Sequence, residues 1–343
     1  MKQGNLKRKI SVFIGCMLLA GLAHPCGLFA QRKITIKLAS LAPENTAWGD
    51  ALNRISRAWS EVTRGEVELV VYHNGVVGEE KDVLQKLKLN QIQAAVFTSF
   101  GISLFYPKIM TLSAPFFIRN DDELKAVLDE LKPELEKDIN AQNFQTLTWV
   151  KSGWVKIFSK SPVFVPEDLK RLKMGTSTDT PELTQAFKNM GYNMIPIGGN
   201  DTLIALNSNQ IQAVYQSPLI VGSLQIFGVA KHMTSMNVAP FMAGIFLNQR
   251  AWRTIPDQYK AELIRRSDLI AKEIDLSVTR LEDQAVKTMT TYGLVVNQIN
   301  PDQAQQWYDD AKKGIDRLLG TTFDRNLYQR IQGILENYRN RKR

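Results

Sequence analysis

The chain has 343 residues, 44% of them apolar, so it can bury a sizeable core, and its length favours two lobes over one. Its formal net charge is +9, and loss of the four basic residues of the N-terminal leader described below leaves +5. The charges are dispersed except in the basic tail 339–343, which is typical of a frayed, solvated chain end. We therefore predict no nucleic-acid partner.

The first thirty residues are typical of a secretory signal peptide. Basic residues at positions 2, 7, 8 and 9 precede an apolar run over 10–23, and Ala30 supplies the small residue before a cut. The run is too short for a membrane-spanning helix. We predict a signal peptide at 1–30 and a periplasmic mature protein.

Both cysteines, Cys16 and Cys26, lie in this leader. A mature chain cut after Ala30 therefore has neither a disulfide nor thiol chemistry. Lipidation at Cys16 or Cys26 is the alternative, although the residues before each cysteine fit a lipobox poorly.

The mature chain opens with a strand, a helix and a second strand. Residues 34–39 alternate apolar and polar, a helix with one apolar face starts at about Thr46, and the valine-rich segment 66–72 reads as a strand. This order predicts a βαβ unit and a partly parallel sheet.

Two further strands are predicted to connect the halves of the molecule. Residues 144–150 leave the first lobe, and residues 241–248 return to it. The amide-rich turn and apolar strand at 90–96 resemble those at 209–215, which is a weak internal repeat expected if the two lobes share one plan.

The segment 257–292 contains neither glycine nor proline. As one helix it would extend roughly 54 Å, longer than a single lobe needs. Gly293 is a natural helix stop. The last predicted helices, about 301–319 and 323–338, are amphipathic and are expected to pack on the second lobe.

Sequence motifs of catalysis are missing. The mature chain has two histidines, His73 and His232, without a metal-ligand partner at suitable spacing. Neither a nucleophile elbow, a phosphate-binding loop nor a dinucleotide fingerprint occurs. We predict a protein that is not an enzyme and that uses neither a cofactor nor a metal.

Several segments in the same order carry a family resemblance. Pro166 to Thr176 reads Pro-Glu-Asp-Leu-Lys-Arg-Leu-Lys-Met-Gly-Thr, a short helix ends at Met190-Gly191, and Ala213 to Pro218 reads Ala-Val-Tyr-Gln-Ser-Pro. Together with His73–Glu80 and Leu112–Asn120, they resemble the DctP-type substrate-binding proteins of TRAP transporters. The resemblance covers Ile34 to about Asn337.

The resemblance implies an α/β, two-lobe periplasmic-binding-protein (Venus-flytrap) fold with mixed sheets and a long helix bracing both lobes. Lobe I is expected at 31–150 plus about 241–275, and lobe II at 151–240 plus about 276–338. The implied partners are a small-molecule ligand, the TRAP integral membrane permease subunits and, as in some systems, a periplasmic tetratricopeptide-repeat protein.

The family's ligand anchor is absent from this sequence. An arginine grips the substrate carboxylate in the family, and the matching residue here is Gly175. A second family arginine falls near Lys156, but a lysine does not reproduce a planar bidentate fork. Arg171, four residues before Gly175, is the alternative source of the missing charge.

The resemblance also implies which residues line the interlobe cleft. Each aromatic among them fits a core position equally well. The expected ligand-binding residues are Leu41, Trp48, Phe97, Thr98, Phe100, Trp154, Lys156, Gly175, Ser177, Gly199, Asn200, Tyr215 and Gln216.

Glycines at 175 and 199 in place of bulky residues predict a larger and less polar cavity. A free carboxylate there would lose solvation without gaining a partner. We therefore expect an apolar or amphipathic ligand, similar to a lipid or fatty acid. The alternatives are an organic-acid receptor of the same family, a periplasmic ligand sensor, or a scaffold or lipid carrier without transport.

Overall fold

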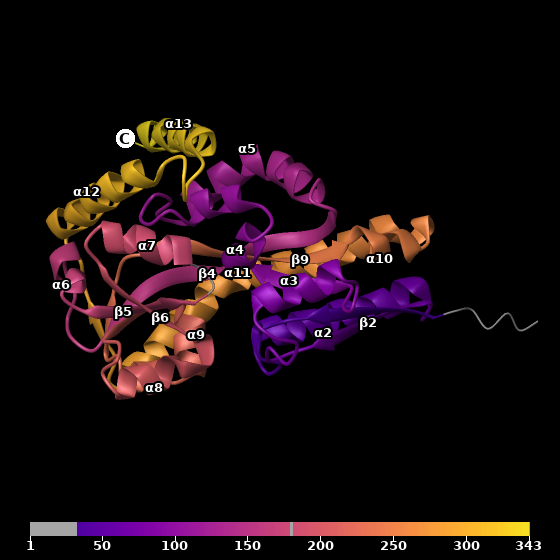
Figure 1. The fold of residues 1–343 in the computed structure, drawn as a ribbon, viewed down its shortest axis with the longest axis horizontal. Helices are drawn as coiled ribbons and strands as arrows, with labels where there is room; N and C mark the ends of the chain where they lie inside the picture. The colour runs from indigo at the N-terminus through magenta and orange to yellow at the C-terminus, as the bar shows by residue number, and fades with distance from the viewer. Residues whose placement is uncertain (1–32, 179–180, 343) are drawn as a thin grey trace, which may run out of the picture. The chain divides into compact units, whose positions relative to one another are not determined.

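The strands form one mixed sheet. The computed structural model describes residues 33–178 and 181–342 (Figure 1). The sheet follows the order β2-β1-β3-β9-β4-β7-β5-β6, and β8 with β10 extends it beside β4. The strands are β1 (Ile34–Ala39), β2 (Val67–Tyr72), β3 (Ala94–Thr98), β4 (Phe144–Ser159), β5 (Lys173–Ser177), β6 (Asn193–Ile197), β7 (Ala213–Gln216), β8 (His232–Thr234), β9 (Ala239–Asn248) and β10 (Val295–Asn297).

Two groups of parallel strands have the same arrangement. β1 pairs in parallel with β2 and β3, and β5 pairs in parallel with β6 and β7. A long antiparallel strand flanks each group, β9 beside β3 and β4 beside β7, and these two strands pair with each other. We call the part built on β1, β2 and β3 the first lobe and the part built on β5, β6 and β7 the second lobe. The predicted partly parallel sheet is confirmed.

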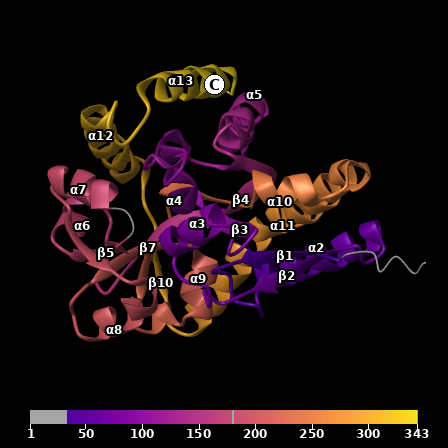
Figure 2. The same ribbon diagram turned by 45° about the vertical axis from the view of Figure 1, so that its right-hand side comes forward.

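Helices cover both lobes (Figure 2). Within the described residues, the short 3₁₀ segments are Pro107–Ser113, Gly199–Asp201 and Ile226–Gly228. The α-helices are α2 (Ala47–Thr63), α3 (Glu80–Lys88), α4 (Ser99–Ser103), α5 (Asp121–Asn140), α6 (Pro166–Lys170), α7 (Pro181–Asn189), α8 (Thr202–Asn207), α9 (Pro218–Ser223), α10 (Gln249–Thr254), α11 (Asp257–Thr291), α12 (Pro301–Leu318) and α13 (Arg325–Arg341). None of the helices among these residues combines the length and apolar character that a membrane crossing requires.

The first helix shows how local sequence sets its ends. The Thr46 hydroxyl caps α2 by accepting a hydrogen bond from the Gly49 N–H at 3.2 Å, and Arg64 ends the helix in a left-handed conformation. The predicted apolar face is buried, with Ile55 and Trp59 almost inaccessible to solvent. The helix start predicted at Thr46 is confirmed.

The repeated turn has the same hydrogen bonds in both lobes. In the first lobe, the Gln93 N–H donates to the Lys37 carbonyl at 3.0 Å, and the Gln93 side-chain oxygen accepts from the Lys37 N–H at 3.1 Å. In the second lobe, Gln212 makes the same pair of contacts with Lys173 at 2.7 and 3.2 Å. The weak sequence repeat therefore marks a shared structural plan.

The long helix α11 spans 35 residues, and Gly293 follows it with a φ of 98°. Its first half packs into the first-lobe core through Leu263 and Ile270, while Met289 near its end lies in a second-lobe core. The predicted brace across both lobes is confirmed (Figure 1).

The last two helices attach to different lobes. α12 packs on the second lobe, where the Trp307 indole donates to the Phe164 carbonyl at 2.9 Å. α13 packs instead on α5 of the first lobe, and its Tyr328 stacks on Phe117, in the segment before α5, with ring centroids 4.3 Å apart. The prediction that both helices pack on the second lobe is wrong for α13, because its apolar face fits beside α5.

The basic tail is also tied down. Arg339 forms a bidentate contact with the buried Glu123 carboxylate at 2.8 Å, and Lys342 pairs with Asp122 at 2.6 Å. The expected fraying is wrong, because α13 extends to Arg341 and the acidic start of α5 supplies partners, whereas residues 340–342 are exposed to solvent as expected.

Candidate functional site

The carboxyl ends of the parallel strands define the candidate site. In open α/β sheets, ligands bind in the crevice beyond these strand ends. In the first lobe, the loops after β1, β2 and β3 begin at Ser40, His73 and Ser99. In the second lobe, the corresponding loops follow Ser177, Ile197 and Gln216.

The first-lobe candidates include one exposed apolar residue and several half-buried ones. Leu41 is 36% exposed, and Trp48 packs half-buried against the core beneath α2. The Thr98 hydroxyl accepts from the Phe100 N–H at 3.2 Å and donates to the Glu80 carboxylate at 2.8 Å. Phe100 is half-buried at the first-lobe core.

Phe97 lies in the core of the first lobe. Its side chain is 0% exposed and contacts Phe105 and Phe246, with ring centroids 5.6 and 6.2 Å away. The sequence placed Phe97 in a ligand-facing loop, but strand alternation turns this ring into the apolar interior.

Gly175 does not open a cavity. An ideal Cβ built on Gly175 would lie 2.8 Å from Cδ1 of Ile211, a side chain that is fully buried. Ile211 therefore fills the space above the glycine, and the expected enlargement at this position is wrong. Gly199 differs, since a Cβ there would meet no atom within 4 Å and the residue is exposed.

Lys156 is engaged by neighbouring groups. Its ammonium donates to the Ser235 carbonyl at 3.0 Å and to the Asn237 side-chain oxygen at 2.9 Å. Burial lowers the pKa of Lys156, although the negative charges of Glu282 and Asp283 oppose this shift. The Lys156 charge is thus committed to the structure.

The remaining second-lobe candidates have mixed environments. Arg171 is exposed at the end of α6. The indole of Trp154 is buried and donates to Asp121 at 2.9 Å. Tyr215 borders a small apolar cavity, and burial raises its pKa to about 12. The Gln216 side-chain oxygen accepts from the Ser217 N–H at 3.0 Å.

Two predicted residues lie partly outside the described part of the chain. Ser177 ends β5 and Asn200 lies in the 3₁₀ segment after β6, but their side chains are not described. The predicted leader 1–30, with Cys16 and Cys26, lies outside the described residues as well.

The cavities differ sharply in size and polarity. The apolar cavity beside Tyr215, bordered also by Phe116, Met174, Phe187 and Trp307, has a volume of about 20 Å³, which holds about one water molecule.

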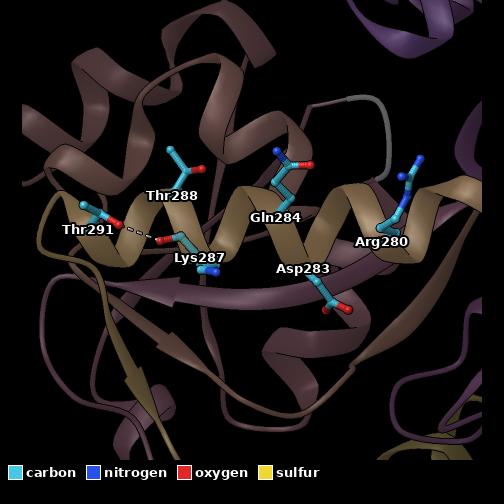
Figure 3. A pocket seen from close by; sticks show the side chains of 6 residues that line it. All are labelled: Arg280, Asp283, Gln284, Lys287, Thr288 and Thr291. Atoms are coloured by element: carbon cyan, nitrogen blue, oxygen red, sulfur yellow. Dashed lines mark hydrogen bonds between the residues drawn. The ribbon is translucent and has the colours of Figure 1, made fainter.

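A larger hollow of about 560 Å³ runs along exposed polar residues of α11 (Figure 3). Arg280, Gln284 and Thr288 project to one side of the helix there, and Asp283 projects to the other. The lining residues are Arg280, Asp283, Gln284, Lys287, Thr288 and Thr291.

The sequence profile described as "Bacterial extracellular solute-binding protein, family 7", or DctP, matches residues 38–320. The chain belongs to this family. Its members are substrate-binding receptors of TRAP transporters and not enzymes, so the chain is a binding protein. Family 7 proteins are periplasmic, bind small molecules and work with membrane permease subunits.

Relatives share limited identity over most of their length. The 2,3-diketo-L-gulonate-binding periplasmic protein YiaO of Escherichia coli is 21% identical over 70% of this chain and 76% of its own. The sialic acid-binding periplasmic protein SiaP of Vibrio cholerae is 22% identical over 74% and 77%.

Solved structures of TRAP solute-binding proteins have the same two-lobe fold. A Desulfovibrio desulfuricans protein with bound sn-glycerol-3-phosphate has a TM-score of 0.80 at 17% identity, covering 89% of this chain and 97% of its own. A Xanthobacter autotrophicus protein with bound β-D-galacturonate has a TM-score of 0.78 at 18% identity, covering 88% and 99%. At these identities the likeness shows the fold alone.

Sequence reasoning missed two buried carboxylates of this family 7 protein. Glu80 receives the Thr98 hydroxyl, and Glu282 on α11 receives the Trp154 N–H at 3.0 Å. Each carboxylate faces a glycine, Gly101 or Gly153, at which an ideal Cβ would lie 2.4 Å from its oxygen. The sequence signal for each buried carboxylate was a glycine that does not lie in a predicted turn.

Proposed function

We propose that this receptor binds an amphipathic solute whose apolar part faces the cleft and whose polar group stays at the rim. The observation that carries the proposal is the 2.8 Å approach of an ideal Gly175 Cβ to Ile211 Cδ1, which leaves no room for a cationic side chain at the family's anchor position. Lys156 is occupied by Ser235 and Asn237. A buried carboxylate without a partner costs several kcal/mol, on the order of an unpaired buried charge.

The proposed site is narrower than the sequence predicted. It retains the strand-end positions Leu41, Thr98, Phe100, Gly199 and Gln216, whose residues are exposed or half-buried. The ring of Phe97 is left out, because it is buried among other aromatics. The apolar cavity of about 20 Å³ is too small for an acyl chain, so the apolar part of the solute would lie between the lobes.

An organic acid is the second candidate solute. The names of the relatives favour it, since YiaO is described as binding 2,3-diketo-L-gulonate and a Sulfurospirillum deleyianum protein was solved with bound succinate. An organic acid would need another cation, and Arg280 and Lys287 on α11 are the exposed cations beside the 560 Å³ hollow.

Native and denaturing mass spectrometry of the purified chain tests the two candidates. Recovery of a fatty acid or other amphipathic molecule from the native complex supports the first proposal. Recovery of a small hydrophilic carboxylate contradicts it and supports the organic-acid candidate. If the purified chain is empty, calorimetry with dodecanoate and with succinate decides, since the amphipathic proposal requires tighter binding of dodecanoate.

We further propose that the leader 1–30 is a signal peptide, cleaved on export to the periplasm, and that the receptor delivers its solute to a TRAP permease. The tetratricopeptide-repeat partner, the sensor role and the carrier role stay predictions. A delivering receptor must close when solute binds, because only a ligand that prefers the closed form shifts the lobes. Small-angle scattering with and without the recovered solute measures this. An unchanged radius of gyration would favour a carrier or scaffold.

A further inference from the structure

The contact between α11 and β4 combines apolar anchors in both lobes with side-chain hydrogen bonds along the helix, the first of them from the Thr148 hydroxyl to Asp268 at 2.9 Å. Leu263 and Ile274 bury the first half of α11 in the first lobe, and Met289 buries its end in the second. Between these anchors, Thr279 and Glu282 face β4, the strand that carries the chain from one lobe to the other. Hydrogen bonds between polar groups can be replaced by hydrogen bonds to water at little net cost in free energy. Separating the apolar anchors costs more, because it exposes apolar surface to water. The hydrogen bonds of Thr279 and Glu282 are therefore contacts at which the attachment of β4 can change.

Glu282 is the buried member of this polar stretch. The residue is 5% exposed, and both carboxylate oxygens accept from the backbone N–H of Trp154, at 3.0 and 3.1 Å. The contact joins residues 128 positions apart in the chain. The Glu282 side chain of α11 thus accepts the hydrogen bond of a backbone N–H of β4, as a neighbouring strand would.

Gly153 makes room for this carboxylate. The pairing of β4 with β9 shifts register between Lys151 and Gly153, and Gly153 has a φ of 141°, which favours glycine. An ideal Cβ on Gly153 would lie 2.4 Å from a Glu282 carboxylate oxygen. The bulge in β4 and the carboxylate on α11 are therefore matched in shape.

Charged groups surround Glu282 from several elements. Lys151 and Lys156 approach it from β4, and Asp121 approaches from α5. The Lys151 ammonium donates to Asp121 at 2.6 Å and to the Thr279 hydroxyl at 3.0 Å. Burial opposes ionisation of Asp121, but its bonds to Lys151, Trp154 and Thr279 lower its pKa, so this group stays ionised.

We propose that Glu282 is a positioning residue that latches the bulge of β4 onto α11 and thereby holds the lobes in the present arrangement. On this proposal, opening of the lobes turns β4 against α11 at the bulge and separates the Glu282 carboxylate from the Trp154 N–H. Capture of solute then depends on the latch, because a receptor's apparent affinity scales with the fraction of molecules in the binding arrangement. This last step rests on the proposed receptor function, whereas the latch itself does not.

Protonation of Glu282 changes the stability of the latched arrangement. Burial raises the pKa of Glu282 from 4.5 to about 7, against the bond from Trp154 and the charges of Lys151 and Lys156. A carboxyl group whose pKa is raised in one arrangement stabilises that arrangement at low pH. This stabilisation is lost as pH rises from 4.5 through 7. The latched arrangement is therefore favoured under mildly acidic conditions and weakened under alkaline ones.

Distance measurements between the lobes, with protons as the only ligand, test the proposal. The chain from Gln31 onward lacks cysteine, so spin labels attach at Arg57→Cys on α2 and Lys188→Cys on α7, two exposed positions. Between about pH 5.5 and about pH 8.5, the ratio of latched to released molecules should fall by up to about 30-fold. Glu282→Gln keeps an acceptor without the charge, so it should stay latched at both pH values.

Two more variants make the result decisive. Glu282→Ala removes the acceptor and should release the lobes at both pH values, as should Gly153→Ala. Asp283→Asn, at the exposed neighbouring position, should keep the wild-type pH response. A wild-type response that persists in Glu282→Gln would overturn the proposal, as would identical distances in all variants. These distance measurements need no solute, so their outcome does not depend on the proposed function.

Discussion

The two lobes use the same backbone framework and finish it with different side chains. At the end of β9, the buried Asn248 amide donates to the Leu87 carbonyl and to Asn90, both at 3.0 Å. At the matching place after β4, the Lys160 ammonium donates to the Leu206 carbonyl at 3.0 Å and to Asn209 at 2.6 Å. A buried amide in one lobe thus corresponds to a half-buried ammonium group in the other. The framework is shared because its contacts involve the backbone, and the side chains that complete it are free to differ.

The same comparison explains the missing anchor. Counting two residues past the paired lysines Lys37 and Lys173 places Ala39 of the first lobe opposite Gly175 of the second. Ile92 and Ile211 lie at equivalent positions of the repeated turn, and both are buried. The position that the resemblance matches to an arginine is therefore occupied by a small buried residue in both lobes, and in the second lobe Ile211 fills the space above it.

The largest expected loss of stability comes from disrupting the packing of Ile211 on Gly175. Ile211→Ala should lower the free energy of unfolding by about 3 kcal/mol, because it leaves a cavity above Gly175. Gly175→Ala alone should also destabilise, by about 1–2 kcal/mol, since its Cβ would crowd Ile211. Urea titration followed by circular dichroism measures both effects.

The double variant is the control for this pair. In the Ile211→Ala background, Gly175→Ala should be neutral or stabilising, because the Cβ then enters an empty space. Additive losses would mean that Ile211 and Gly175 do not share one cavity and that the comparison with Ile92 and Ala39 is mistaken.

A smaller effect is expected where α13 joins the first lobe. Arg339→Met should cost about 2 kcal/mol, because it leaves the buried Glu123 carboxylate without its bidentate partner. Glu134→Gln is the matched control, since it breaks the exposed pair between Glu134 and Arg330 at 2.7 Å and should leave stability unchanged. Thermal unfolding of both variants separates the contacts, and equal losses would contradict the role given to burial.

The smallest effect compares the two turns directly. Asn90 and Asn209 have positive φ values of 57° and 58°. Asn90→Ala should cost about 1–2 kcal/mol and Asn209→Ala about 1 kcal/mol or less, because only Asn90 bonds the buried Asn248. Asn→Gly at each position keeps the positive φ without strain, so Asn209→Gly should be nearly neutral, whereas Asn90→Gly should still lose about 1 kcal/mol with the bond to Asn248, as measured by urea midpoints. A larger loss of stability at Asn209 than at Asn90 would contradict the stronger effect that we assign to the bond between Asn90 and the buried Asn248.

Local sequence patterns predicted the elements well. The alternation over 34–39, the cap at Thr46 and the unbroken run from Asp257 each mark a periodicity or a backbone preference that neighbouring residues determine. The repeat of the amide-rich turn likewise depends on local hydrogen bonds. These features need no knowledge of distant partners.

Features that depend on distant partners were not predicted. Ile211 above Gly175, Glu123 with Arg339, and Glu282 with Trp154 join residues that sequence spacing does not connect. The packing of α13 on α5 belongs to the same class. Phe97 was misplaced because the side chain's face follows from strand register, which the family resemblance does not specify.

The position of β9 in the sheet has a consequence for the growing chain on the ribosome. β3 pairs with β9 across residues 94–98 and 243–247, and the first-lobe core also needs Leu263 and Ile274 of α11. A nascent chain that has reached only the end of β3 therefore lacks a neighbouring strand and part of its core. The first lobe is therefore complete only when residues up to 274 have been synthesised. A lobe that is completed late in synthesis suits the export to the periplasm that we propose above.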